Sequence, residues 1–164
     1  MSDSRMVLSK CLNILGLSRP DMEDFDERLR LQKIVYLLWA HGISLGYGFN
    51  WYVRGPYSPK LASDGYALDD EVFEMGSRIR FNKEEEVVES LNNFKEILGE
   101  KINDPLYLEI LASLHYIKKV AFGGRDNFAG ISKWLTSHKP YLKKIEGINT
   151  LIESAYSDLR YFNT

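Results

Sequence analysis

The residue types that carry most enzyme chemistry are few and scattered in this chain of 164 residues. Its three histidines, His41, His115 and His138, lie far apart, and none has the spacing by which two residues of one helix share a metal ion. The single cysteine, Cys11, belongs to an apolar helical stripe without a nearby histidine or aspartate to activate it. We therefore expect no catalytic residue, no metal and no cofactor.

Motifs for nucleotides and for paired acids are missing or incomplete. The chain has no Walker loop, and Trp51 stands where a dinucleotide fingerprint begun by Gly46 and Gly48 needs a further glycine. Adjacent acids such as Asp69 and Asp70 point apart on a helix, because only residues three or four apart share a face. An enzyme whose site is assembled from distant residues remains an alternative.

The most distinctive segment runs from Tyr47 to Tyr57, where five of eleven residues are aromatic. It ends in a Gly55-Pro56 turn, followed by Ser58, a good helix cap, and Pro59, a good first helical residue. One interpretation is structural: an aromatic cluster held in place by the turn, with Ser58 serving only as a cap.

The other interpretation is a recognition surface built on the same turn. It would consist of Arg54, Tyr57 and Lys60, beside Gln32 and Lys33 from the preceding helix. Aromatic and arginine side chains are favoured at the energetic centres of protein interfaces, which supports binding. The sequence leaves open whether the turn binds a partner or only shapes the fold.

The composition is that of a globular protein with one domain over residues 1–164. The chain is 45% hydrophobic and 27% charged, and its formal net charge of −2 argues against a generally basic nucleic-acid-binding surface. The longest apolar run, Ile34 to Ala40, is far too short to span a membrane, and the first residues lack the apolar core of a signal peptide. We expect a cytoplasmic protein without membrane association.

The elements that must position these residues are mainly helical. Apolar residues recur every three or four positions in several segments, and Gly or Pro ends or begins them. The expected helices cover residues 5–17, 26–41, 59–68, 83–98, a segment opening at Pro105, a shorter one after Asp126, and a last one from Pro140 that contains Gly147. Asn82 is the expected cap of the 83–98 helix, with Asp104 and Asp126 as caps further on.

Two short segments read as strands instead. Apolar and polar residues alternate near residues 49–54 and again at 77–81, and we expect the two to pair in a small hairpin or ribbon. The predicted fold class is therefore mainly α: one bundle of about six to seven helices with a minor sheet. Its order of elements is compatible with a winged-helix-like arrangement.

Two stretches of the chain resemble a known family. Leu31 to Leu38, with Gly46-Tyr47 and then Trp51 to Leu61, is similar to the YwgA-like family of uncharacterised prokaryotic proteins, and more distantly to the Panacea domain of SocA-like and GepA-like antitoxins. Leu111 to Ile117 and Lys139-Pro140 extend the YwgA-like resemblance towards the C-terminus. Arg54 departs from the aromatic or small residue usual before the Gly-Pro pair.

The resemblance implies contacts with proteins rather than catalysis. YwgA-like members have no established activity, and Panacea members resemble antitoxins or adaptors of toxin–antitoxin systems. The motif matches also add Tyr52 and Ser58 to the expected surface. The full predicted binding set is Gln32, Lys33, Tyr52, Arg54, Tyr57, Ser58 and Lys60.

The leading hypothesis is a non-enzymatic protein-interaction module, antitoxin-like or a stress- or defence-linked adaptor, whose partner is a protein such as a toxin or defence component. The alternative is a winged-helix-like nucleic-acid-binding regulator with Arg78 and Arg80 on its wing. That alternative is disfavoured because the 59–68 helix has Lys60 as its one base and also carries Asp64, which would repel phosphates. A structural subunit, and a homodimer through exposed aromatic residues, remain open.

Overall fold

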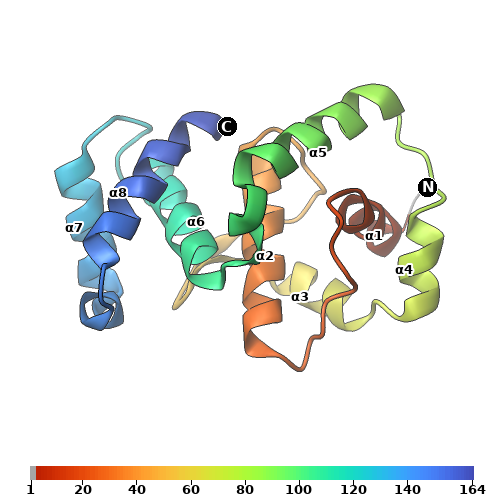
Figure 1. The fold of residues 1–164 in the computed structure, drawn as a ribbon, viewed down its shortest axis with the longest axis horizontal. Helices are drawn as coiled ribbons and strands as arrows, with labels where there is room; N and C mark the ends of the chain where they lie inside the picture. The colour runs from red at the N-terminus through yellow and green to blue at the C-terminus, as the bar shows by residue number, and fades with distance from the viewer. Residues whose placement is uncertain (1–2) are drawn as a thin grey trace.

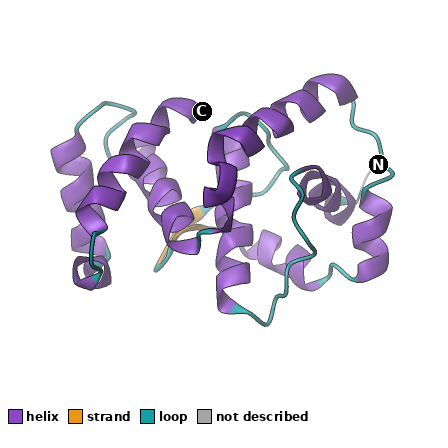
Figure 2. Ribbon diagram, in the orientation of Figure 1, coloured by secondary structure: helices purple, strands orange, loops and turns teal. Residues whose placement is uncertain are grey.

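Helices form most of the computed structural model, which describes residues 3–164 (Figures 1 and 2). In chain order the elements, with η for a 3-10 helix, are α1 (Ser4–Ile14), α2 (Phe25–Ala40), β1 (Asn50–Tyr52), β2 (Gly55–Tyr57), α3 (Pro59–Tyr66), α4 (Asp70–Gly76), α5 (Glu84–Leu98), η1 (Gly99–Asn103), α6 (Pro105–Val120), α7 (Phe128–His138), η2 (Pro140–Lys144), α8 (Ile148–Asp158) and η3 (Leu159–Tyr161). The predicted mainly helical class with a minor hairpin is confirmed.

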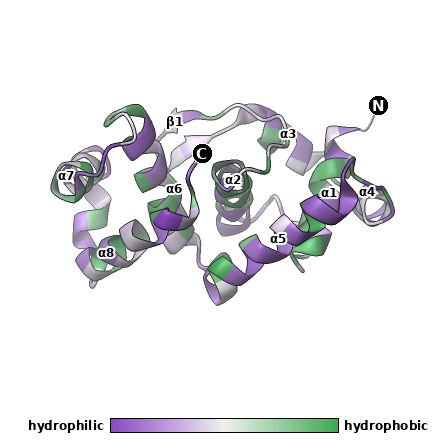
Figure 3. Ribbon diagram, turned by 90° about the horizontal axis from the view of Figure 1, so that it is seen from above, coloured by the Kyte–Doolittle hydropathy of each residue, from purple (hydrophilic) through white to green (hydrophobic). Residues whose placement is uncertain are grey.

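Helix α2 lies in the middle of the molecule, with α6 on one side and α1 and α5 on the other (Figure 3). Nearly every residue from Leu29 to Ala40 is buried, because neighbouring helices cover α2 on most of its circumference. Helices α6, α7 and α8 form one end of the molecule, and α1, α3, α4 and α5 gather towards the other (Figure 1). No helix in residues 3–164 is both long and apolar enough to cross a bilayer.

The apolar stripe expected on the first helix does face the core. Leu8, Cys11, Leu12 and Leu15 are all buried, and fully burying a leucine contributes about 1.5–3 kcal/mol. Leu8 and Leu12 join a small cluster that includes Leu61, which fastens α3 to this part of the fold. The short helix that carries Ser58 as its cap is thereby held close to α2.

The hairpin differs from the prediction in both its turn and its pairing. The turn predicted at Gly55-Pro56 lies at Val53 and Arg54 instead, and Gly55-Pro56 belong to β2 because they pair with β1. Strand β1 pairs antiparallel with β2, so that Asn50 lies opposite Tyr57 and Tyr52 opposite Gly55. Residues 77–81, predicted as the second strand, do not form one. The Ile79 carbonyl instead accepts a hydrogen bond from the Lys10 ammonium group, and the Phe81 N–H donates to the Glu84 carboxylate. Side chains therefore satisfy backbone groups that a strand partner would otherwise occupy.

Two predicted helix caps are confirmed. The Ser58 hydroxyl oxygen accepts a hydrogen bond from the Leu61 N–H at 3.2 Å, and the Asp104 carboxylate accepts one from the Tyr107 N–H at 3.2 Å. Both helices continue with a proline at their first position, where the missing N–H costs nothing. These local signals explain why both helix starts were readable.

Other helix boundaries differ from the predictions. Lys83, with a φ of +56°, precedes α5 in place of the expected cap Asn82, and Asn127 rather than Asp126 caps α7. Helix α4, capped by Asp69, was not foreseen. With seven residues, α4 has too few turns to show a clear periodicity of apolar residues in the sequence.

The single long C-terminal helix expected from Pro140 is wrong. The chain forms η2, breaks at Gly147 and then forms α8 and η3. Gly147 has a φ of +75°, which an α-helix interior does not allow and which glycine adopts readily.

Candidate functional site

The hairpin lies between α2 and α6, and Gly55 fits it to α6. The two residues at the hairpin tip, Val53 and Arg54, have negative φ values, and the positive value falls on Gly55 at +98°. A β-carbon on Gly55 would lie 2.5 Å from the Ser113 hydroxyl oxygen of α6. Glycine is thus needed here both for its backbone conformation and for the close approach.

Gln32 of α2 fastens the end of the hairpin by both atoms of its amide group. Its Nε2 donates to the Ser58 carbonyl at 2.9 Å, and its Oε1 accepts from the Ser58 N–H at 2.8 Å. Both residues are buried, so each bond replaces water that these polar groups have lost. The position of Ser58 ahead of α3 depends on this pair of bonds.

Two buried lysines hold the hairpin carbonyls. The Lys33 Nζ donates to the Pro56 carbonyl at 2.7 Å, and the Lys139 Nζ donates to the Val53 carbonyl at 2.6 Å. Lys139 also lies 3.1 Å from the carboxylate of Glu109, which accepts a hydrogen bond from the Tyr141 hydroxyl as well. The hairpin is therefore attached to α2 through Lys33 and to α6 through Lys139 and Glu109.

Burial shifts the titration of both lysines. Desolvation, together with the charge of Lys139, lowers the pKa of Lys33 to about 7. Desolvation also lowers the pKa of Lys139, to about 8, although the Glu109 carboxylate opposes that shift. Both amines have structural hydrogen-bond partners, so the arrangement is best explained as support for the hairpin.

An apolar groove of about 300 Å³ runs between α2, the hairpin and α3. Its lining includes four aromatic residues and an arginine: Phe25, Tyr52, Tyr57, Tyr66 and Arg28. Phe25, Tyr52 and Tyr66 are 49%, 45% and 62% exposed, although large aromatic side chains are usually covered. The ring centres of Tyr52 and Tyr57 lie 4.8 Å apart, and the two rings form one wall of the groove. Exposed aromatic side chains gathered around a concavity are typical of a binding site.

The groove takes in five of the seven residues that the sequence predicts for a binding surface. These are Gln32, Lys33, Tyr52, Arg54 and Tyr57. The other two lie outside its lining: Ser58 is buried as the α3 cap, and Lys60 pairs with Asp64 at 2.9 Å. Gln32 and Lys33 hold hairpin backbone groups, so Tyr52, Arg54 and Tyr57 are the predicted residues left to contact a ligand.

Sequence reasoning missed several residues of this site. Phe25, Arg28 and Leu29 lie on the same helix face as the predicted Gln32, and this spacing could have extended the predicted surface towards the start of α2. Nothing in the sequence links Lys139 to the hairpin, because the two lie 86 residues apart.

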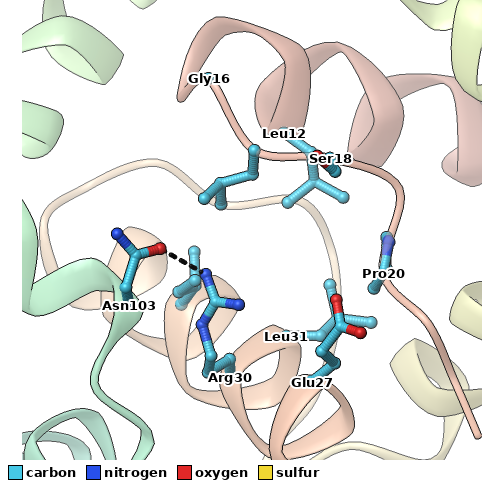
Figure 4. Close-up of a pocket in the computed structure, with 10 residues that line it drawn as sticks. Leu12, Gly16, Ser18, Pro20, Glu27, Arg30, Leu31 and Asn103 are labelled. Atoms are coloured by element: carbon cyan, nitrogen blue, oxygen red, sulfur yellow. Dashed lines mark hydrogen bonds between the residues drawn. The ribbon is translucent and has the colours of Figure 1, made fainter. Parts of the chain in front are cut away.

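A second concavity, of about 200 Å³, lies between α2, η1 and the loop after α1 (Figure 4). Its arginine, Arg30, donates to the Asn103 side chain at 3.0 Å and to the Ile102 carbonyl at 3.2 Å. These bonds join α2 to η1. The arginine of this concavity thus has its partners within the fold, which makes the concavity a weaker candidate than the groove at the hairpin.

Cys11 and His115, two residue types that often carry out catalysis, lie in the interior of the fold. Cys11 is buried, and desolvation raises its thiol pKa to about 12, far from a reactive thiolate. The Nδ1 of His115 lies 2.7 Å from the Tyr36 hydroxyl in the core. Within residues 3–164, no three His, Cys, Asp or Glu side chains come together as metal ligands would.

Comparisons of the chain with protein families, characterised proteins and solved structures find no match.

Proposed function

We propose that this chain is a non-enzymatic protein-interaction module of the antitoxin-like or stress- and defence-linked adaptor kind, acting in the cytoplasm of a prokaryote. The observation that carries the proposal is the apolar groove walled by exposed aromatic side chains beside Arg28 and Arg54. Tyrosine and arginine, together with tryptophan, are the residues most enriched at positions where truncation weakens protein complexes.

The hairpin is held as a prepared binding surface would be. Gln32 and Lys33 of α2, with Lys139 between α7 and η2, hydrogen-bond to backbone groups of the hairpin and of Ser58, so the Tyr52–Tyr57 wall does not have to be ordered when a partner binds. Ordering a loop costs affinity, and a preformed surface avoids that cost. The sequence resemblance to YwgA-like and Panacea proteins agrees with a protein as the partner.

The test is co-purification from native cells with matched surface variants. Tyr66 lines the groove and Val120 does not, yet both are 62% exposed. We expect a stoichiometric partner with the wild-type chain, its loss with Tyr66→Ser combined with Tyr52→Ser, and its retention with Val120→Ser. A partner retained by both variants would contradict the groove as the binding surface.

The nucleic-acid alternative gains no support from the hairpin. Its expected wing arginines, Arg78 and Arg80, lie outside β1 and β2, and Lys60 of α3 is paired with Asp64. A low-salt filter-binding titration still tests it directly: retention of duplex or single-stranded DNA at micromolar protein would favour this alternative over the adaptor.

A further inference from the structure

Two arginines give the lining of the groove a positive charge. Arg28 and Arg54 line it, and none of its lining residues within 3–164 is an aspartate or glutamate. This local excess contrasts with the net charge of −2 for the whole chain. A partner that fits the groove must complement this charge as well as its apolar walls.

The two arginines converge on one exposed ring. The guanidinium carbons of Arg28 and Arg54 lie 5.7 Å and 5.5 Å from the centre of the Phe25 ring. Arg28 donates to the Met22 carbonyl at 2.9 Å. Arg54 forms a long ion pair with the buried Glu109 at 3.9 Å, beyond direct hydrogen-bond distance, and its guanidinium carbon lies 4.4 Å from the centre of the Tyr141 ring. A guanidinium has five N–H donors, so both retain donors for an anionic group of a ligand.

The size of the groove suits one side chain of a bound protein segment better than a whole small molecule. A volume of about 300 Å³ is at the lower limit of small-molecule sites, and the groove is open along the exposed Tyr52 and Tyr66. An apolar or aromatic side chain can enter between these rings while the backbone of the segment stays outside. An acidic neighbour on the same segment would then meet the arginines at the Phe25 end.

We propose that the groove binds a protein segment in which an aspartate or glutamate adjoins a large apolar residue. The apolar side chain fills the space between Tyr52 and Tyr66, and the carboxylate pairs with Arg28 and Arg54. This inference rests on the proposed interaction function and names the chemistry of its partner.

Selection from a random-peptide phage library on the immobilised full-length chain tests the inference. We expect the enriched peptides to carry Asp or Glu next to, or one residue away from, an aromatic or long aliphatic residue. A synthetic peptide of the consensus is then titrated by fluorescence anisotropy. Changing its acid to the amide should weaken binding by roughly tenfold to a hundredfold, the worth of a charged hydrogen bond.

A double-mutant cycle locates the carboxylate. On the protein with Arg28→Gln and Arg54→Gln, the same acid-to-amide change should cost less than about twofold, because the charged partners are gone. Arg125→Gln, an exposed arginine outside the groove, should leave the full loss in place. Thermal melts of all three proteins establish that they are folded.

The outcomes separate the two proposals. Peptides that require Tyr66 but carry no acid, or whose acid contributes equally on the wild-type and double-variant proteins, would overturn the acidic partner and leave the adaptor function intact. If no selected peptide loses affinity with Tyr66→Ser, both proposals fail.

Discussion

Gly55 of the hairpin packs directly against Ser113 of α6. A β-carbon on Gly55 would lie 2.5 Å from the Ser113 hydroxyl oxygen but 3.7 Å, an ordinary contact distance, from the Ser113 β-carbon. That hydroxyl is buried, and no group in residues 3–164 hydrogen-bonds to it. The steric limit on position 55 therefore comes from one oxygen atom.

Gly55→Ala should destabilise the fold by roughly 2–4 kcal/mol, combining the strain of a positive φ with overpacking. Ser113→Ala alone should be neutral or stabilising by up to about 1 kcal/mol, because an unpaired buried hydroxyl disappears. In the Ser113→Ala background, Gly55→Ala should cost only about 1–2 kcal/mol, the strain component. Urea unfolding of the four proteins measures the coupling.

Gly48→Ala is the matched control for this cycle, since a β-carbon there meets no atom within 4 Å. It should change the unfolding free energy little. Strict additivity of the Gly55 and Ser113 changes would show that the hydroxyl does not limit the contact.

Gln32 should matter more to stability than the cap that it positions. Gln32→Leu leaves the buried Ser58 N–H without a partner, at about 1–3 kcal/mol, and also removes one of the two bonds to the Ser58 carbonyl, which still accepts from the Ala62 N–H. Ser58→Ala removes only the bond to the Leu61 N–H and should cost about 1 kcal/mol. Chemical denaturation gives both values, and the reverse order would mean that the amide does not hold the hairpin.

Lys33 should make the fold more stable as pH rises from 7. Its folded pKa of about 7 lies below the ordinary 10.5, so in this range the unfolded chain binds more protons and the unfolding free energy rises with pH. Lys33→Met should remove about 1 kcal/mol of that rise per pH unit, the effect of one proton. Unfolding measured at several pH values between 7 and 9 shows the slope.

Lys139 faces the same hairpin beside Glu109 and contributes its own share of the slope, which Lys33→Met leaves in place. Lys60→Met, at an exposed lysine, serves as the control and should leave the slope unchanged. An equal slope in wild type and Lys33→Met would mean that the Lys33 amine titrates as in the unfolded chain.

His115 should produce a loss of stability in acid. Desolvation, with help from the nearby Lys119 charge, lowers its pKa to about 4 from 6.5, so the unfolded chain binds the proton first as pH falls. Between pH 6.5 and pH 4, this shift lowers the free energy of unfolding by about 3 kcal/mol. His115→Gln should reduce this loss, whereas His138→Gln, at an exposed helix end, should not; thermal melts across this range compare them.

Helix positions were largely readable because their signals are local. The stripe of Leu8, Cys11 and Leu12 and the caps Ser58 and Asp104 act within a few residues of the chain, and each is found as predicted. The strand at 77–81 failed because alternation describes a half-buried extended segment and does not name its partner. Lys10 and Glu84 take the place of that partner.

The sequence by itself determined the helical class, a small hairpin that includes residues 50–52, and five of the thirteen residues that line the groove. Only the tertiary structure decided which polar groups are buried supports of the hairpin and which face the groove. In the sequence, nothing about Lys33 or Lys139 indicates that its amine hydrogen-bonds to a backbone carbonyl of the hairpin. The reason is physical: burying an amine is tolerable only when hydrogen-bond acceptors surround it, and for Lys139 an acceptor comes from Val53, 86 residues away.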